Sequence, residues 1–392
     1  MQNFDFNVQT RIHFGKGMIA KLPEEVKRYG NRMFFLYDSI PAKATGAYDV
    51  IHKLCEENGI EITEFTGIEP NPRHSTVDAA CAAFREAEAD VIVALGGGST
   101  MDTAKAMSFT VNYSGSCWDF YTRKAVADME HLVPVISIPT AAAAGAEVSN
   151  VSVISNVEEK KKLDYRFDLQ RPVACIADPE YTFTVPAFQT ALGVVDIVAH
   201  SYEGYFSQYQ GSIQDGISES IQKACIEAGR KVLLCPRDYD ARAQLLWASG
   251  LAITHLSDQG RHFMAPIHNS EHVLSAYYDI PHAAGIAVLS VAWFKYILND
   301  TTVSRLARWG RNVWSIDPSL DEYTIARKAI EAYESFLKEL GVPTRMRELR
   351  TQIPQEMLLP MAQDVYPSLP AKEWFKPLNS AEELAEVFRI AY

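Results

Sequence analysis

A strand-to-turn junction near residue 90 constrains the fold more than any other feature of this sequence. Residues 90–95 are almost continuously apolar, which is typical of a strand buried on both faces of a parallel sheet. Three consecutive glycines, Gly96, Gly97 and Gly98, follow at once, and a helical pattern begins at about residue 100. The junction therefore predicts a layer in which strands and helices alternate.

The rest of the chain up to residue 183 fits that layer. Further β-rich runs alternate with helical patterns in which apolar residues recur three and four positions apart. The expected strands are 32–37, 61–65, 90–95, 133–139, 151–155 and 173–177, and the expected helices are 20–29, 48–58, 75–88 and 100–111. We expect an α/β domain over residues 1–183.

The second half of the chain has a different pattern. After Asp178 and Pro179 the strand-like runs vanish, and helical patterns such as 222–234, 241–255 and 325–340 continue to the end. We therefore expect an all-helical domain over residues 184–392.

Composition and charge exclude several classes of protein. Hydrophobic residues make up 47% and charged residues 22%, as in an ordinary folded globular protein. The net charge of −12 and the lack of a basic run disfavour nucleic acid and anionic membranes as partners. The six cysteines are widely spaced and the N-terminal residues lack an apolar signal core, so we expect a cytoplasmic protein. The longest apolar run, 284–298, contains Lys295 and is too short to span a bilayer, so it predicts a core helix.

The glycine junction also predicts a binding site. Without Cβ atoms the backbone can approach a ligand closely, and the following helix N-terminus, with Ser99 in its first turn, offers unpaired N–H groups to a phosphate. The alternative is a plain tight turn capped by Ser99 or Thr100. Met101 stands where the GxGxxG fingerprint has its third glycine, so that fingerprint is absent.

Asp38 follows the expected strand 32–37 at its C-terminal end. A carboxylate in this place accepts hydrogen bonds from the ribose 2′-OH of NAD and repels the 2′-phosphate of NADP. The alternative is ordinary turn chemistry with Ser39 and Pro41. We expect NAD to be preferred over NADP.

Histidines gather in the second half of the chain. His268, His272 and His282 lie within 15 residues, although the whole sequence has only ten histidines. Asp196 and His200 lie four apart in the helical pattern 187–206, so their side chains share a face. These groups could converge on one divalent metal. The alternatives are a hydrogen-bonded Asp–His pair and histidines satisfied in the core or at the surface.

Together these motifs resemble the iron-containing (group III) alcohol dehydrogenase family, in particular its butanol-dehydrogenase-like branch. The resemblance runs from residues 14–17 through 67–72 to 341–343. It implies an α/β nucleotide-binding domain followed by an all-helical domain, a dehydroquinate synthase-like architecture, with NAD(P) and a divalent metal. It also implies the metal ligands Asp196, His200, His268 and His282, an uncoordinated active-site His272, and Lys162 close to the nicotinamide.

One segment departs from the family pattern. Where the family usually reads PTTAGTGSE, residues 139–147 read PTAAAAGAE, so several hydroxyl groups near the cofactor are replaced by methyl groups. Each lost hydrogen bond is worth about 0.5–1.5 kcal/mol, which predicts weakened cofactor binding. The expected cofactor-binding residues are Asp38, Gly96, Gly97, Gly98, Ser99, Asp102 and Thr140.

These inferences predict a metal-dependent oxidoreductase that transfers a hydride between NAD(P)(H) and a primary alcohol or aldehyde such as butanol or butyraldehyde. We expect Fe²⁺ as the metal, with Zn²⁺ as the alternative, and a homodimer without nucleic-acid or membrane partners. Two other functions remain open at this point: a metal- and NAD-dependent lyase of the dehydroquinate-synthase type, and a cofactor-binding protein without turnover.

Overall fold

The computed structural model describes residues 2–261 and 265–392. The chain forms two compact units that are interleaved in sequence. The sheet unit comprises Asn7–Pro186 and Cys235–Thr254, and the helical unit comprises the residues up to Phe6, Ala187–Leu234 and His255–Tyr392. The expected domain boundary at residue 184 stays a prediction, while the chain itself passes between the units after residues 6, 186, 234 and 254.

The sheet unit contains a six-stranded sheet in which every neighbouring pair is parallel. The strand order is β1-β8-β5-β4-β2-β3. These strands are β1 (Arg11–Phe14), β2 (Arg32–Tyr37), β3 (Glu61–Phe65), β4 (Val91–Gly96), β5 (Val135–Pro139) and β8 (Ala174–Ala177). The α/β layer predicted from the sequence is confirmed.

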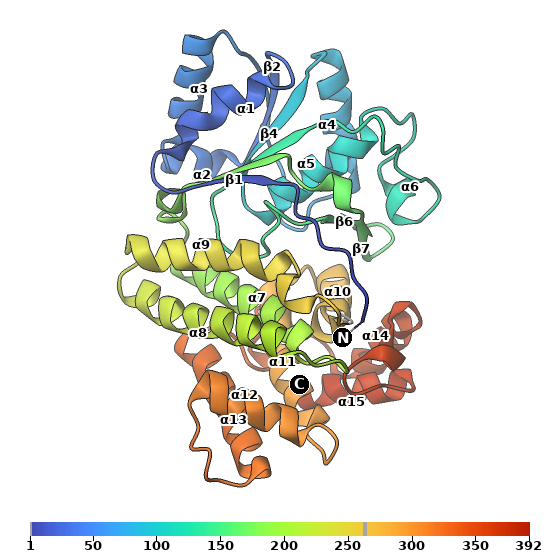
Figure 1. Cartoon of the computed structure of the whole chain (residues 1–392). Helices are drawn as coiled ribbons and strands as arrows, with labels where there is room; N and C mark the ends of the chain where they lie inside the picture. Colours follow the sequence, from blue (N-terminus) through green and yellow to red (C-terminus); the bar gives the residue numbers. More distant parts are fainter. Residues whose placement is uncertain (1, 262–264) are drawn as a thin grey trace. The chain divides into compact units, whose positions relative to one another are not determined.

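Alternate residues of the central strands pack on opposite faces of this sheet. Met33 and Phe35 of β2 join the core formed with α1 (Leu22–Lys27) and α3 (Ala47–Asn58). Phe34 and Leu36 join the core formed with α4 (His74–Glu86) and α5 (Gly98–Thr110). Figure 1 shows these helices around the sheet in blue and cyan. Burial on both faces explains why β2 and β4 read as continuous apolar runs.

One expected strand lies outside the sheet. Residues 151–155 were expected in the α/β layer, but β6 (Val151–Asn156) pairs antiparallel with β7 (Lys161–Arg166) in a separate two-stranded sheet. A short connection suffices for an antiparallel pair, whereas a parallel neighbour would need a long crossover. β7 was not expected because its sequence, KKLDYR, is mostly charged.

A helix from the second half of the sequence belongs to the sheet unit. α9 (Tyr239–Ile253) packs against the alanine-rich segment, where Ser249 Oγ donates a hydrogen bond to the Ala143 carbonyl at 3.0 Å. Gly145 has a φ of +65°, and a Cβ there would lie 2.5 Å from the Ser249 carbonyl oxygen. Ile253 joins a small core with Val148 and β8. The alanine-rich departure therefore lies under α9.

No strand occurs among the described residues of the helical unit, as expected for an all-helical domain. Its longer helices are α7 (Ala187–Tyr205), α8 (Ser212–Leu234), α10 (Pro266–Tyr278), α11 (His282–Ile297), α12 (Val303–Trp314), α13 (Glu322–Glu339), α14 (Leu358–Val365) and α15 (Ala381–Ala391). Aromatic rings in tilted and edge-to-face contacts, including Phe294, Trp309 and Tyr333, fill its core. Within the described ranges, the helices are too short or too polar to cross a membrane.

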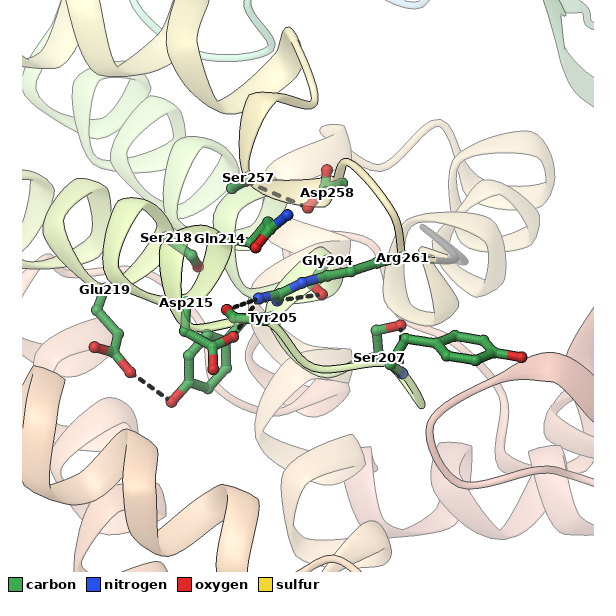
Figure 2. Close-up of polar contacts among 12 residues, drawn as sticks. Gly204, Tyr205, Ser207, Gln214, Asp215, Ser218, Glu219, Ser257, Asp258 and Arg261 are labelled. Atoms are coloured by element: carbon green, nitrogen blue, oxygen red, sulfur yellow. Dashed lines mark hydrogen bonds and ion pairs between the residues drawn. The ribbon is translucent and has the colours of Figure 1, made fainter. Parts of the chain in front are cut away.

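A buried charge network fixes the end of α7. The Asp215 carboxylate on α8 binds Arg305, with an Nη1–Oδ2 distance of 2.7 Å, and also binds Arg261. Arg261 donates to the Gly204 carbonyl at 3.2 Å, and Arg305 donates to the Tyr205 carbonyl. Figure 2 shows Arg261 reaching between Asp215 and Gly204. Because the last carbonyls of a helix lack partners within it, these two arginines stabilise the last turn of α7.

Candidate nucleotide site and metal centre

Three predicted cofactor segments meet at the C-terminal edge of the sheet. The Asp38 N–H donates to the Leu95 carbonyl at 3.0 Å, and the Thr140 N–H donates to the Gly96 carbonyl at 2.9 Å. The ends of β2, β4 and β5 are thereby joined. The chain leaves β2 toward β3 on one side and leaves β4 toward β5 on the other, so a topological switch point lies between β2 and β4. Open α/β sheets bind ligands at such points.

The three glycines have different local surroundings. A Cβ on Gly96 would lie 2.8 Å from the Thr100 Cβ, so this glycine lets helix and strand pack closely. A Cβ on Gly97 would meet no atom within 4 Å, and one on Gly98 would meet only Ala144, at 3.9 Å. α5 begins at Gly98 without a side-chain cap, contrary to the alternative in which Ser99 or Thr100 caps it. This open backbone fits a nucleotide phosphate.

Asp102 and Lys162 have protein partners in the structure. Asp102 Oδ1 lies 2.9 Å from the buried Lys105 Nζ, and Asp102 Oδ2 accepts a hydrogen bond from the Val153 N–H at 3.1 Å. Burial lowers the pKa of Lys105, against the opposing charge of Asp102. Lys162 Nζ donates to Asn71 Oδ1 at 3.0 Å. Asp102 therefore links α5 to β6, and the cofactor roles of both residues stay predictions.

The Asp38 carboxylate also participates in its turn. Asp38 Oδ1 accepts a hydrogen bond from the Ile40 N–H at 3.2 Å and caps α2 (Ser39–Ala44). The turn chemistry considered as an alternative is therefore present. It does not exclude a ribose contact, since a carboxylate has about four acceptor positions.

Three helices carry the predicted metal ligands. Asp196 and His200 lie one turn apart on α7, and His268 and His272 lie one turn apart on α10. Pro281 precedes α11, and His282 is its first residue. α11 packs against both α7 and α10, so residues far apart in the sequence meet within the helical unit.

Three histidine side chains converge around the Asp196 carboxylate. Asp196 Oδ1 lies 3.3 Å from His268 Nε2 and 3.7 Å from His200 Nδ1. The ring centroids of His200 and His268 are 4.3 Å apart, and those of His268 and His282 are 5.3 Å apart. One potential ligand atom from each of Asp196, His268 and His282 lies within 4.8 Å of the others. The structure thus brings together the residues expected to hold a metal.

The electrostatics of this cluster fit a cation. Burial and the neighbouring His268 lower the pKa of His200 to about 3. Burial would raise the pKa of Asp196, but the surrounding imidazoles outweigh it and hold this pKa below its usual range. His200 Nδ1 is buried and makes no hydrogen bond to any described residue. One carboxylate and three imidazoles with an orphaned nitrogen form a donor set that suits divalent iron or zinc.

Two buried glutamates of this region were not predicted. Glu203 accepts a hydrogen bond from His268 Nδ1 at 2.5 Å, and Glu271 accepts one from His282 Nδ1. Burial would lower the pKa of His268, but the charge of Glu203 outweighs it and raises this pKa to about 10. A sequence signal existed, because Glu203 lies seven residues after Asp196 and Glu271 three after His268, on the same helical faces.

His272 lies beside the cluster. Its ring centroid is 5.7 Å from that of His282, and the side chain is partly exposed. Its ring nitrogen can also group with Glu271 and His282 within 4.8 Å.

Comparisons with known proteins agree along the whole chain. Residues 9–179 match the sequence profile of iron-containing alcohol dehydrogenase, and residues 190–391 match that of the C-terminal part of the Fe-containing alcohol dehydrogenase family. NADH-dependent butanol dehydrogenase A of Clostridium acetobutylicum is 41% identical over 100% of both chains. NADPH-dependent aldehyde reductase YqhD of Escherichia coli is 33% identical over 89% of both. A crystal structure of NADH-dependent butanol dehydrogenase A from Thermotoga maritima, 30% identical, superposes with a TM-score of 0.92 and covers 100% of this chain and 99% of that one.

Proposed function

The chain belongs to the iron-containing alcohol dehydrogenase family, and on that premise we propose that it transfers a hydride between NAD(H) and a primary alcohol or aldehyde of butanol size, with Fe²⁺ in the helical unit. NAD(P)-dependent alcohol or aldehyde oxidoreduction is the activity of the family. The preference for NAD, the substrate size and the identity of the metal are finer parts of the proposal.

Each bound group has a distinct chemical task. When bound, the metal supplies a Lewis acid for the substrate oxygen, and the nicotinamide supplies or accepts the hydride. Asp196, His200, His268 and His282 would hold the metal. The burial of the first three, and the grouping of ligand atoms from Asp196, His268 and His282, support this assignment. With one negative charge among four ligands, the site keeps the net positive charge that stabilises a developing alkoxide.

The sheet unit binds the dinucleotide in this proposal. The open backbone at Gly97 and Gly98 and the first turn of α5, with Ser99, hold the pyrophosphate. Asp38 holds the adenine-side ribose. Thr140 follows β5, beside the end of β4. Asp102 is a cofactor-binding residue and Lys162 lies close to the nicotinamide in this proposal. Asp102 also bonds to Val153 of β6, and Lys162, on β7, bonds to Asn71.

His272 carries the proton in this proposal. It is partly exposed, whereas His200 and His268 are buried, and its ring lies near that of His282. A histidine at the edge of such a centre can pass the proton of the alcohol to water.

We also propose a cytoplasmic homodimer. All six cysteines are free and five of them are buried, which suits a reducing compartment. In the sheet unit, Phe14 and Trp247 line a shallow apolar pocket, and Trp247 is 42% exposed, which favours contact with a second chain. Analytical ultracentrifugation measures the mass of the assembly.

The convergence of Asp196, His200, His268 and His282 is the observation that carries the proposal. The test is an assay of the purified protein with Fe²⁺, NADH and butyraldehyde, in which we expect one NADH consumed for each alcohol formed. A lyase, or a binding protein without turnover, would consume none.

Variants separate the ligand set from the proton carrier. His268→Ala is expected to lose most of its metal and activity, while the exposed His131→Ala keeps both. His272→Ala is expected to keep the metal and lose turnover or shift its pH profile. Full metal content in His268→Ala, or metal loss in His272→Ala, would contradict these assignments.

A further inference from the structure

Two buried glutamates stand behind two of the histidines of the metal centre. Glu203 is 2% exposed and holds His268 Nδ1, and Glu271 is fully buried and holds His282 Nδ1. Because each carboxylate takes the δ nitrogen, the ε nitrogen of each ring is left for the centre. His268 Nε2 indeed lies 3.3 Å from Asp196 Oδ1. We propose that Glu203 and Glu271 are positioning residues that fix the tautomer and the ring direction of these two histidines.

Glu271 lies in a pocket built from its neighbours. A Cβ on Gly285 of α11 would lie 2.5 Å from Glu271 Cγ and 2.6 Å from its Oε1, so only glycine leaves room for this side chain. Ser275 Oγ donates to Glu271 Oε1 at 2.5 Å and also lies 3.0 Å from the Ile280 carbonyl oxygen. Burying a carboxylate costs several kcal/mol unless it is hydrogen-bonded. Ser275 and His282 provide these bonds, and Gly285 provides the space.

Glu203 acts on the helix as well as on the ring. Its Oε1 accepts the backbone N–H groups of Ile267 at 2.7 Å and His268 at 3.1 Å, in the first turn of α10. A carboxylate is favoured there by the unpaired N–H groups and the helix dipole. Glu203 therefore fixes both the start of α10 and the ring of His268 against α7.

The third imidazole lacks such a carboxylate. His200 Nδ1 makes no hydrogen bond to any residue in the described ranges and lies 3.7 Å from Asp196 Oδ1. The centre is therefore asymmetric. Carboxylates orient the rings of His268 and His282, whereas His200 Nδ1 would gain a partner only by binding a metal. Carboxylates hydrogen-bonded to ligand histidines typically change metal affinity 10- to 100-fold. The expected change in metal affinity rests on the proposed ligand set. The orientation of the two rings by Glu203 and Glu271 does not depend on that ligand set.

The experiment compares Glu271→Gln with Glu219→Gln in the full chain. Glu219 is a buried glutamate of the same unit, bonded to Tyr205, Arg308 and Asn312 rather than to a histidine. We expect Glu271→Gln to bind Co²⁺ roughly 10- to 100-fold more weakly in competition with a chelator, with a changed cobalt absorption spectrum. Gly285→Ala is expected to act in the same direction, because its Cβ displaces Glu271. Glu219→Gln is expected to keep the cobalt affinity and the cobalt absorption spectrum of the unmodified chain.

A second readout needs no metal. In metal-free protein labelled with ¹⁵N-histidine, His282 and His268 are each expected to give a downfield Nδ1–H signal, assigned with His282→Asn and His268→Asn. Glu271→Ala is expected to remove the His282 signal alone. Unchanged cobalt affinity and spectrum in Glu271→Gln, an equal loss in Glu219→Gln, or a His282 signal that survives in Glu271→Ala would each overturn the proposal. If the unmodified chain bound no cobalt, the ligand set would fail, and the ring signals would still decide the role of Glu271.

Discussion

A single residue of the sheet unit can combine a structural role with a place at the proposed cofactor site. Asp38 illustrates this, because one side chain caps α2 and also lies at the switch point of the sheet. The sequence predicted its place from the strand before it. The sequence could not decide between a ribose contact and a turn-capping hydrogen bond for Asp38, because a carboxylate at this position suits both roles.

Replacing Asp38 is expected to change cofactor choice. The unmodified enzyme should have a higher kcat/KM with NADH than with NADPH, and Asp38→Gly should narrow or reverse the ratio. A change of about tenfold or more is expected, because a carboxylate close to a phosphate costs more than about 1.4 kcal/mol at an effective dielectric near 20. Asp38→Asn keeps a capping oxygen for Ile40 and isolates the charge. A preference of the unmodified enzyme for NADPH would refute the ribose contact.

Glu147, at the end of the alanine-rich segment, makes stability depend on pH. Burial raises the pKa of Glu147 from 4.5 to about 7, against the opposing charge of Lys105. The folded protein therefore keeps a proton that the unfolded chain releases above pH 4.5, so stability falls as the pH rises through about 7. The full effect is roughly 3 kcal/mol.

Glu147→Gln should abolish this decline and raise the urea midpoint at pH 8 relative to the parent. Midpoints measured from pH 5 to pH 8 test it, with the exposed Glu130→Gln as the control that keeps the parent profile. A decline in Glu147→Gln equal to that of the parent would assign the pH dependence to another group.

Whole elements were predicted where periodicity carried the signal. β2 and β3 have the expected ends, and the core helix expected at 284–298 is α11 (His282–Ile297). β1 was not predicted because it has only four residues, RIHF, and β7 was not predicted because its sequence, KKLDYR, is mostly charged. The network on Asp215 escaped for another reason: it joins Arg261 and Arg305, which only tertiary packing brings together.

That network predicts a large effect of one substitution on the helices that it joins. Asp215→Asn leaves Arg305 and Arg261 buried without their carboxylate, at 1% side-chain exposure each. Breaking a buried ion pair from one side costs about 3–5 kcal/mol. The thermal midpoint should fall accordingly. Glu386→Gln, which breaks the exposed pair with Arg389, should cost at most about 1 kcal/mol. Similar midpoints for the two variants would contradict the role of the network.

At the scale of the whole molecule, the metal centre was easier to predict than the packing of the chain. The histidine cluster was visible because its members are close in sequence, whereas its combination with Asp196 and His200 as a ligand set came from the resemblance to the family. The membership of α9 in the sheet unit could not be predicted, because its sequence indicates a helix but does not indicate which part of the chain the helix packs against. The need for glycine at position 145 is explained only by the structure, in which the Ser249 carbonyl oxygen leaves no room for a Cβ.

Fragments test this interleaving. Residues 7–186 alone lack α9, so the small core of Val148, Cys175 and Ile253 is incomplete and the fragment should melt without a cooperative transition. The same fragment joined by a flexible linker to residues 235–254 should melt cooperatively in near-ultraviolet circular dichroism. A cooperative transition of equal midpoint in both would show that α9 is dispensable for the sheet unit.

The position of α9 also sets the order of events during synthesis. A ribosome adds roughly 5–20 residues per second, and domains tend to fold as they emerge. The strands of the sheet are all made by residue 177, yet the partner of Gly145 and Ala143 leaves the ribosome only after residue 253. For several seconds the apolar residues of the nascent sheet unit that pack against α9 stay exposed, because α9 has not yet been synthesised. A chaperone that binds exposed apolar surface would bind the nascent chain at that stage. The packing of α9 onto the sheet unit would then release the chaperone.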